Sequence, residues 1–184
     1  MAKGKVKATK LTVNLPFGLG QLDFQPDEVQ HRAAWELYVE LSTRIAVQPL
    51  GPHEGLLREA LSSLYAIFGA TREILRQAGP SVAQGPNSFG AIAIEVLNKG
   101  MRPFLAKWHP LLLAHEQDRP PNVNARDHEL TWARSAELRQ ELTELQAQMM
   151  IYVQALARIA GVAIPDRNSK KRSVEKSRKS HPAG

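Results

Sequence analysis

The feature that most constrains the fold is an apolar repeat near the C-terminal end of the chain. Large apolar residues recur there at alternating steps of three and four, namely Leu138, Leu142, Leu145, Met149, Tyr152, Leu156 and Ile159. This spacing places them on one face of an α-helix. We therefore predict a long helix over about 126–161, ended by Gly161, that packs along another helix. The same face could serve a homodimer, but a helical bundle favours packing within the chain.

Three further helical segments precede this repeat. Pro26-Asp27-Glu28 predicts a helix start, and the helix should run to about residue 47. Its inward stripe is expected to contain Trp35, Tyr38, Val39, Ser42 and Ile45. A second helix should cover 53–78 and end at Gly79-Pro80. A third region, 88–117, has Ser88 as its N-cap and a seam of Ile94, Leu97, Met101, Phe104, Trp108 and Leu111 that continues across Pro103.

These segments predict an all-α fold of the four-helix-bundle type. Residues 1–25 form a basic N-terminal arm, extended or folded as a hairpin, because apolar residues alternate imperfectly around two glycines. Residues 26–162 form the helical domain. Residues 163–184 lack a recurring apolar face and are rich in Lys, Arg and Ser, which predicts a disordered basic tail.

Composition excludes several classes of site and of location. The chain has no cysteine, which rules out disulfides and thiolate sites. It has no apolar run of membrane-spanning length and no signal-peptide pattern, so we expect a cytoplasmic protein without membrane contact. His53-Glu54 and His115-Glu116 lack the second histidine of a zinc motif, and Gly18-Leu19-Gly20 lacks the rest of a phosphate loop. We therefore expect no cofactor and no metal.

The net charge of +6 is concentrated at the two ends of the chain. Residues 1–10 and 165–184 together carry +9, which leaves −3 for the segment between them. Polyanion binding is therefore expected at the ends of the chain rather than on its folded body. The candidate residues in the tail are Lys170, Lys171, Arg172, Lys176, Arg178 and Lys179.

The segment LNKGMRPFLAKWHP contains the strongest candidate for chemistry. Arg102 and His109 are seven residues apart, which returns them to nearly the same helix face about 10 Å apart. Their spacing resembles the R-x4-6-H motif of HEPN ribonucleases, which are small helical bundles that generally assemble the site across a dimer. The resemblance implies that Arg102 stabilises a phosphate and that His109 acts in acid-base chemistry. Pro103 and Pro110 depart from the family's pattern.

A second interpretation of this segment requires no chemistry. Pro103 and Gly100 predict a bend in the helix. Lys99, Arg102 and Lys107 would then face solvent or pair with acids such as Glu95, while Trp108 fills the core. His109 would hydrogen-bond free carbonyls near a helix end. Alternatively, Lys99, Arg102, Lys107 and Trp108 form a patch that binds a partner protein.

A broader resemblance covers residues 57–162. The segments ALSSLYAIFGATREIL, LNKGMRPFLAKWHPLL and LARIAGV resemble uncharacterised bacterial helical proteins associated with conflict or defence systems. That resemblance implies an accessory role. The preferred prediction is a non-enzymatic helical interaction module that binds a protein partner or a second copy through its helical surfaces. The alternatives are a ribonuclease using Arg102 and His109, and a nucleic-acid-binding protein using its basic tails.

Overall fold

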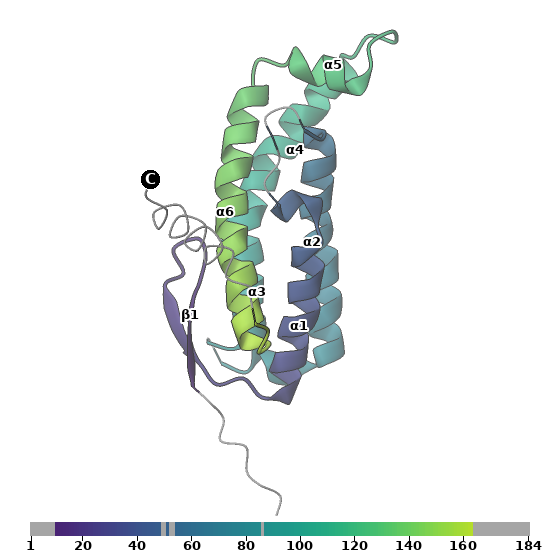
Figure 1. The fold of residues 1–184 in the computed structure, drawn as a ribbon. Helices are drawn as coiled ribbons and strands as arrows, with labels where there is room; N and C mark the ends of the chain where they lie inside the picture. The colour runs from purple at the N-terminus through teal and green to yellow at the C-terminus, as the bar shows by residue number, and fades with distance from the viewer. Residues whose placement is uncertain (1–9, 49–50, 52–53, 86, 164–184) are drawn as a thin grey trace, which may run out of the picture.

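The structure is a computed structural model that describes residues 10–48, 51, 54–85 and 87–163. The described chain is mostly helical, with one small sheet at its N-terminal end (Figure 1). The long helices run side by side around a shared apolar core, and the hairpin lies against one flank of them. None of the described helices has the length and apolar character needed to cross a bilayer. The predicted basic tail lies outside the described residues, as do residues 1–9 of the arm.

The N-terminal arm is a hairpin. Strands β1 (Leu11–Asn14) and β2 (Gln21–Phe24) pair antiparallel, with Leu11 opposite Phe24. The hairpin is fixed to α6 because the Phe17 N–H donates to Oε1 of Gln148 at 2.8 Å. Val13 is completely buried, which adds an apolar contribution to that attachment.

Helix α1 (Glu28–Ser42) begins where the sequence predicts, and its N-cap Asp27 accepts the Gln30 N–H at 2.8 Å. The 3₁₀ turn η1 (Ile45–Val47) follows it. The predicted inward stripe is wrong, since Trp35 and Ile45 are 48% and 68% exposed. The buried face instead contains Ala33, Ala34, Leu37 and Leu41. Alanine on this face lets α1 approach both α2 and α6 closely, which larger side chains would prevent.

Helix α2 (Leu57–Ala78) ends at the predicted stop signal. Gly79 adopts a φ of +80°, and its N–H donates to the Leu75 carbonyl at 3.1 Å. The short turn η2 (Pro80–Ala83) follows and leads to Ser88, the predicted N-cap, which accepts the Ala91 N–H at 3.3 Å. Both boundary predictions are confirmed.

The third helical region is continuous across Pro103, as predicted. Helix α3 (Phe89–Glu95) passes through a π-helical segment, η3 (Val96–Met101), into α4 (Arg102–Gln117). Pro103 has no N–H to donate to the carbonyl one turn earlier. The helix is wider just before it, as a π-helix, and there the Arg102 N–H donates to the Leu97 carbonyl five residues earlier. The seam is buried at Leu97, Met101, Phe104 and Trp108, but Ile94 is 45% exposed, contrary to the prediction.

The predicted long C-terminal helix is two helices. Helix α5 (Ala125–Leu130) ends where the Thr131 hydroxyl donates to the His128 carbonyl at 2.7 Å. Helix α6 (Ser135–Ile159) then begins, and the prediction of a single helix from 126 is wrong. The predicted seam is confirmed, because every one of its residues from Leu138 to Ile159 is buried within this one chain.

Candidate functional site: a groove between α2 and α4

A groove of about 490 Å³ lies between α2 and α4. Its lining residues are Tyr65, Phe68, Arg72, Arg102, Leu105, Ala106, His109 and Pro110. The α2 residues follow helical steps of three and four, and so do the α4 residues, which is why each helix presents one continuous wall. Tyr65 is 62% exposed, which is unusual for an aromatic side chain at the edge of a core.

Arg102 and His109 line this same groove. Arg102 donates from Nε and Nη2 to Oδ1 of Asn98 at 3.0 and 2.9 Å. Its guanidinium also lies 5.5 Å from the centre of the Phe68 ring. Because Asn98 is uncharged, these contacts hold the guanidinium in place without neutralising it.

The protonation state of His109 is set by Arg58. Nη1 of Arg58 lies 3.0 Å from Nδ1 of His109. A guanidinium group has hydrogen-bond donors and no acceptor. Nδ1 is therefore the acceptor and Nε2 carries the proton. Burial lowers the pKa of His109, and the charge of Arg58 lowers it further, against a smaller opposing effect of Glu116. The imidazole is thus neutral at pH 7.

The remaining donor of His109 has no acceptor. Nε2 is buried and has no hydrogen-bond partner among the described residues. The Tyr65 ring meets the imidazole edge to face, with 5.8 Å between ring centres. A buried donor without a partner is costly, so such a group commonly marks a place where a ligand or a water binds. The expectation that His109 binds free carbonyls near a helix end is wrong, because α4 continues to Gln117.

Glu116 fixes the position of Arg58. The two side chains form a bidentate ion pair, with Nε at 3.0 Å from both carboxylate oxygens and Nη2 at 2.7 Å from Oε2. Such a pair restricts the guanidinium more than a single contact does. Glu116 and Arg58 therefore act together to hold the His109 ring in one tautomer.

The other predicted partner-binding residues lie away from the groove lining. Lys99 pairs with Glu95 at 2.8 Å. Trp108 is completely buried, and its Nε1 donates to Glu141 at 2.8 Å. Lys107 contacts Glu137 and Glu141 at 3.1 and 2.5 Å. Of the four predicted residues, Arg102 is thus the one that lines the groove and has no carboxylate partner among the described residues.

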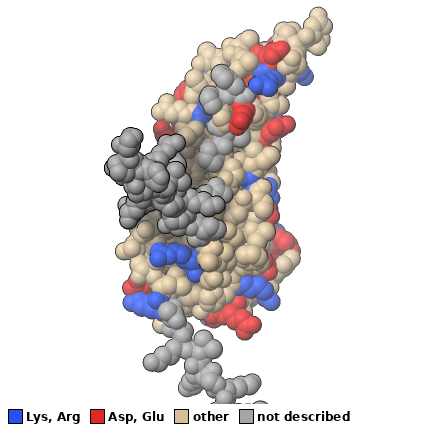
Figure 2. Space-filling view, in the orientation of Figure 1, with Lys and Arg blue, Asp and Glu red and all other residues tan. Residues whose placement is uncertain are grey.

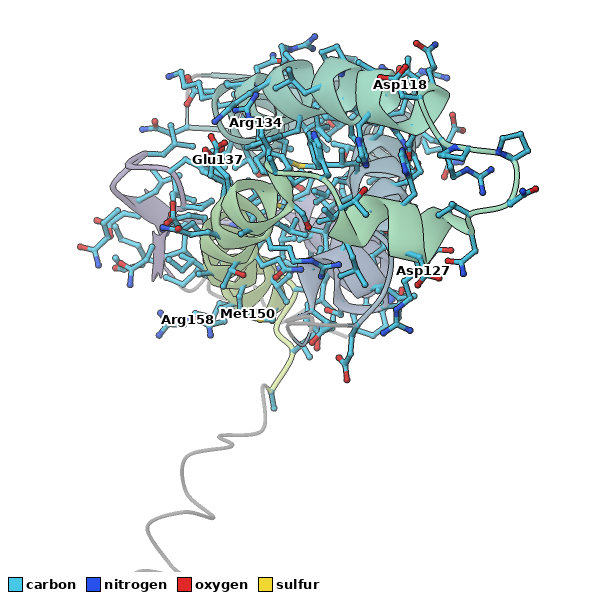
Figure 3. All side chains as sticks on the ribbon, turned by 90° about the horizontal axis from the view of Figure 1, so that it is seen from above. Asp118, Asp127, Arg134, Glu137, Met150 and Arg158 are labelled. Carbon is cyan, nitrogen blue, oxygen red and sulfur yellow. The ribbon has the colours of Figure 1, made fainter. Side chains whose placement is uncertain are left out.

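The cluster around Lys107 is an ion network at the start of α6. Arg134 donates to Glu137 at 2.9 Å, and the two side chains lie close together in Figure 3. Hydrogen bonds from Arg134 and Lys107 lower the pKa of Glu137 to about 2. The Lys107 and Arg134 cations lie 4.4 and 4.7 Å from the Trp108 ring. On the face drawn in Figure 2, basic and acidic side chains are likewise interspersed.

Three residues of the site escaped the sequence analysis because they are polar or aromatic positions of α2. Tyr65 and Arg72 line the groove, and Arg58 contacts His109, but the analysis of this helix followed its apolar seam. A signal was present, since Tyr65 and Arg72 are seven residues apart, as are Arg102 and His109. The sequence did not indicate that these two faces meet.

The predicted polyanion-binding residues, Lys170, Lys171, Arg172, Lys176, Arg178 and Lys179, lie outside the described residues. Within the described ranges, no cluster of three or more His, Asp or Glu side chains could hold a metal ion. The sequence matches no protein-family model, and comparisons with curated proteins and with solved structures likewise gave no match.

Proposed function

We propose that this chain is a helical protein–protein interaction module that binds a segment of a partner protein in the α2–α4 groove. The observation that carries the proposal is an exposed apolar groove whose two arginines have no carboxylate partner among the described residues. Its apolar lining includes Tyr65 and Phe68, and its rim holds Arg102 and Arg72 outside any ion pair of the described residues. An apolar centre with a few fixed polar groups is typical of a recognition site.

The finer description of the fold belongs to the same proposal. We regard α1, α2, the α3–α4 unit and α6 as a four-helix-type bundle, with α5 as an addition at one end. The resemblance of residues 57–162 to bacterial helical proteins supports an accessory role in a larger, defence-type assembly. Nucleic-acid binding through the basic ends stays a prediction, because those residues lie outside the described ranges.

A random peptide library tests this proposal. The immobilised protein is exposed to displayed peptides of about 14 residues, long enough for about four helical turns. The enriched peptides are then tested against Tyr65→Ala, a substitution that an exposed side chain tolerates. Peptides that bind the wild type and lose affinity for Tyr65→Ala support the proposal. A selection without any such peptide contradicts it.

The ribonuclease is the second candidate, and one observation favours it: Arg102 and His109 line the same groove. The tautomer of His109 opposes it, however. A general base needs a free lone pair, whereas Nδ1 is occupied by the Arg58 donor at 3.0 Å and Nε2 already carries the proton. In this arrangement His109 is a hydrogen-bond donor and would need Arg58 to withdraw before it could accept a proton.

An RNA-cleavage assay separates the two candidates. Wild-type protein is compared with Arg102→Ala and His109→Ala, each confirmed to be folded by circular dichroism. The interaction proposal expects no cleavage above background by any of the three. Cleavage by the wild type that both substitutions abolish would replace it with the ribonuclease. In that case Arg58→Ala should increase activity, because it frees Nδ1.

A further inference from the structure

The two groove arginines lack the carboxylate partner that many other cations among the described residues have. Elsewhere Lys99, Lys107 and Arg76 each have a carboxylate partner. Arg72 has no ion-pair or hydrogen-bond partner among the described residues, and Arg102 contacts an amide oxygen instead of a carboxylate. No acidic residue lines the groove. The groove therefore carries two uncompensated positive charges beside an apolar surface.

We infer that the groove's occupant is an amphipathic helix of a partner protein, with carboxylate side chains at one end of its apolar stripe. This inference rests on the proposed function and specifies the chemistry of the partner. The carboxylates would pair with Arg72 and Arg102, and the apolar stripe would cover Tyr65 and Phe68. A helix laid into a groove between two other helices is a recurring mode of peptide recognition.

The arrangement of α2 and α4 around the groove predicts which way a bound helix would run. His109 contacts Arg58 and Tyr65, whereas Arg102 contacts Phe68, so α2 and α4 run antiparallel. Arg102 and His109 are separated by about two helical turns, or about 10 Å along α4. The positive charge is therefore at the Arg102 end of the groove, and the carboxylates of the occupant should lie at that end. An occupant C-terminus placed there would be favoured too, because the helix dipole is negative at that end.

His109 adds one polar contact at the opposite end. Its Nε2–H has no acceptor within the described ranges, and Tyr65 lies against the imidazole. An occupant that shifts the exposed Tyr65 ring would give Nε2 an oxygen to bind. Since the imidazole is neutral, this contact selects an acceptor without requiring a charge on it.

Charge also decides against the chain's own tail as the occupant. Residues 170–179 contain six Lys or Arg and a single Glu, so the groove arginines would repel that segment. An acidic partner segment gains attraction at the same place. It would also bind faster at low salt, because complementary charges steer association.

The test is a set of three library selections. The first uses the wild type and the second uses Arg72→Glu with Arg102→Glu, both confirmed to be folded. The control is Arg76→Glu, which lies one turn beyond Arg72, is largely exposed and does not line the groove. We expect the wild type and the control to enrich acidic peptides, and the double variant to enrich basic ones. Replacing Glu by Lys in the best peptide should weaken its binding to the wild type about tenfold or more.

The outcomes separate the inference from the proposed function. Peptides that depend on Tyr65 but carry no acidic bias, or that bind the double variant unchanged, overturn the inference and leave the interaction module standing. If no peptide depends on Tyr65, both proposals fail. An acidic bias that Arg76→Glu removes as well overturns the inference, because it would reflect net charge alone.

Discussion

Removal of the Glu129 carboxylate tests how the start of α2 is held. Leu56, the N-cap of α2, offers no side-chain hydrogen bond, and the Leu57 N–H instead donates to Oε2 of Glu129 at 2.7 Å. The other oxygen, Oε1, accepts from Nη2 of Arg139, also at 2.7 Å. Glu129 is only 6% exposed, so both contacts are largely shielded from solvent. A carboxylate from α5 therefore caps a helix that begins 72 residues earlier in the sequence.

The magnitude follows from what each substitution leaves behind. Glu129→Ala removes the acceptor of the Leu57 N–H, and leaving this buried donor unsatisfied costs about 1–3 kcal/mol. It also removes the carboxylate that faces Arg139. We therefore expect a loss of about 3 kcal/mol in the free energy of unfolding. Glu129→Gln keeps one oxygen acceptor and should lose about half as much.

Urea denaturation followed by far-ultraviolet circular dichroism measures these losses. Glu137→Ala is the control, because Glu137 also binds an arginine but is exposed, and it should cost much less. The denaturant slope m should be unchanged in all three variants, which would place the effect in the folded state. A Glu129→Ala protein within about 1 kcal/mol of the wild type would refute the capping argument.

Three further predictions concern single sites. Gly100→Ala should lower the melting temperature, because its Cβ would lie 2.3 Å from the Phe17 ring. Adding Phe17→Ala should restore part of that loss. Strictly additive effects of the two substitutions on the melting temperature would contradict this prediction. Gln146→Leu should lower the free energy of unfolding by about 2 kcal/mol, since the buried Gln146 amide donates to two main-chain carbonyls at 3.1 and 2.8 Å. An unchanged midpoint of urea denaturation would contradict this prediction. Folding lowers the pKa of His109 from 6.5, so that, as the pH falls, this histidine is protonated in the unfolded chain before it is protonated in the folded one. At pH values below 6.5 the wild type should therefore lose stability relative to His109→Gln. Parallel pH profiles of the two proteins' thermal unfolding would contradict that assignment.

The parts of the fold that could be predicted are those that local chemistry decides. Alternating steps of three and four defined the α6 seam, and Gly79-Pro80 and Ser88 marked boundaries that the structure keeps. The stripe on α1 failed for a different reason. Two faces of that helix satisfy helical spacing, and side-chain size favoured the one with Trp35. Close packing against two other helices favours the face with Ala33 and Ala34 instead, and that is a tertiary requirement.

The break between α5 and α6 was also beyond the sequence signals. No glycine or proline occurs in 131–134, and the break coincides with the docking of α5 onto α4. His115 and His128 stack 3.9 Å apart, and each donates from Nε2 to the other's carbonyl, at 2.9 and 2.8 Å. These contacts join residues 13 positions apart.

For the candidate site, too, the sequence predicted what lies within one helix and not what another helix contributes. Helical periodicity placed Arg102 and His109 on one side of a helix, and the groove contains both. Their chemistry depends on Arg58, which is 51 residues from His109 and reaches it from another helix. Spacing within one helix could not indicate that donor. The same histidine would act as a base with a free Nδ1, and it is a donor with Nδ1 occupied.

The first turn of α2 contains both the N–H that Glu129 caps and the arginine that contacts His109. Glu129 binds the Leu57 N–H, and the next residue, Arg58, fixes the tautomer of His109 in the groove. Arg58 has a second anchor in Glu116, which lies on α4 with His109, so that contact should persist when α5 loosens. What α5 controls is the position of the α2 wall relative to α4. Glu129→Ala should therefore weaken peptide binding as well as folding, whereas charge reversal at Arg72 and Arg102 should change binding alone.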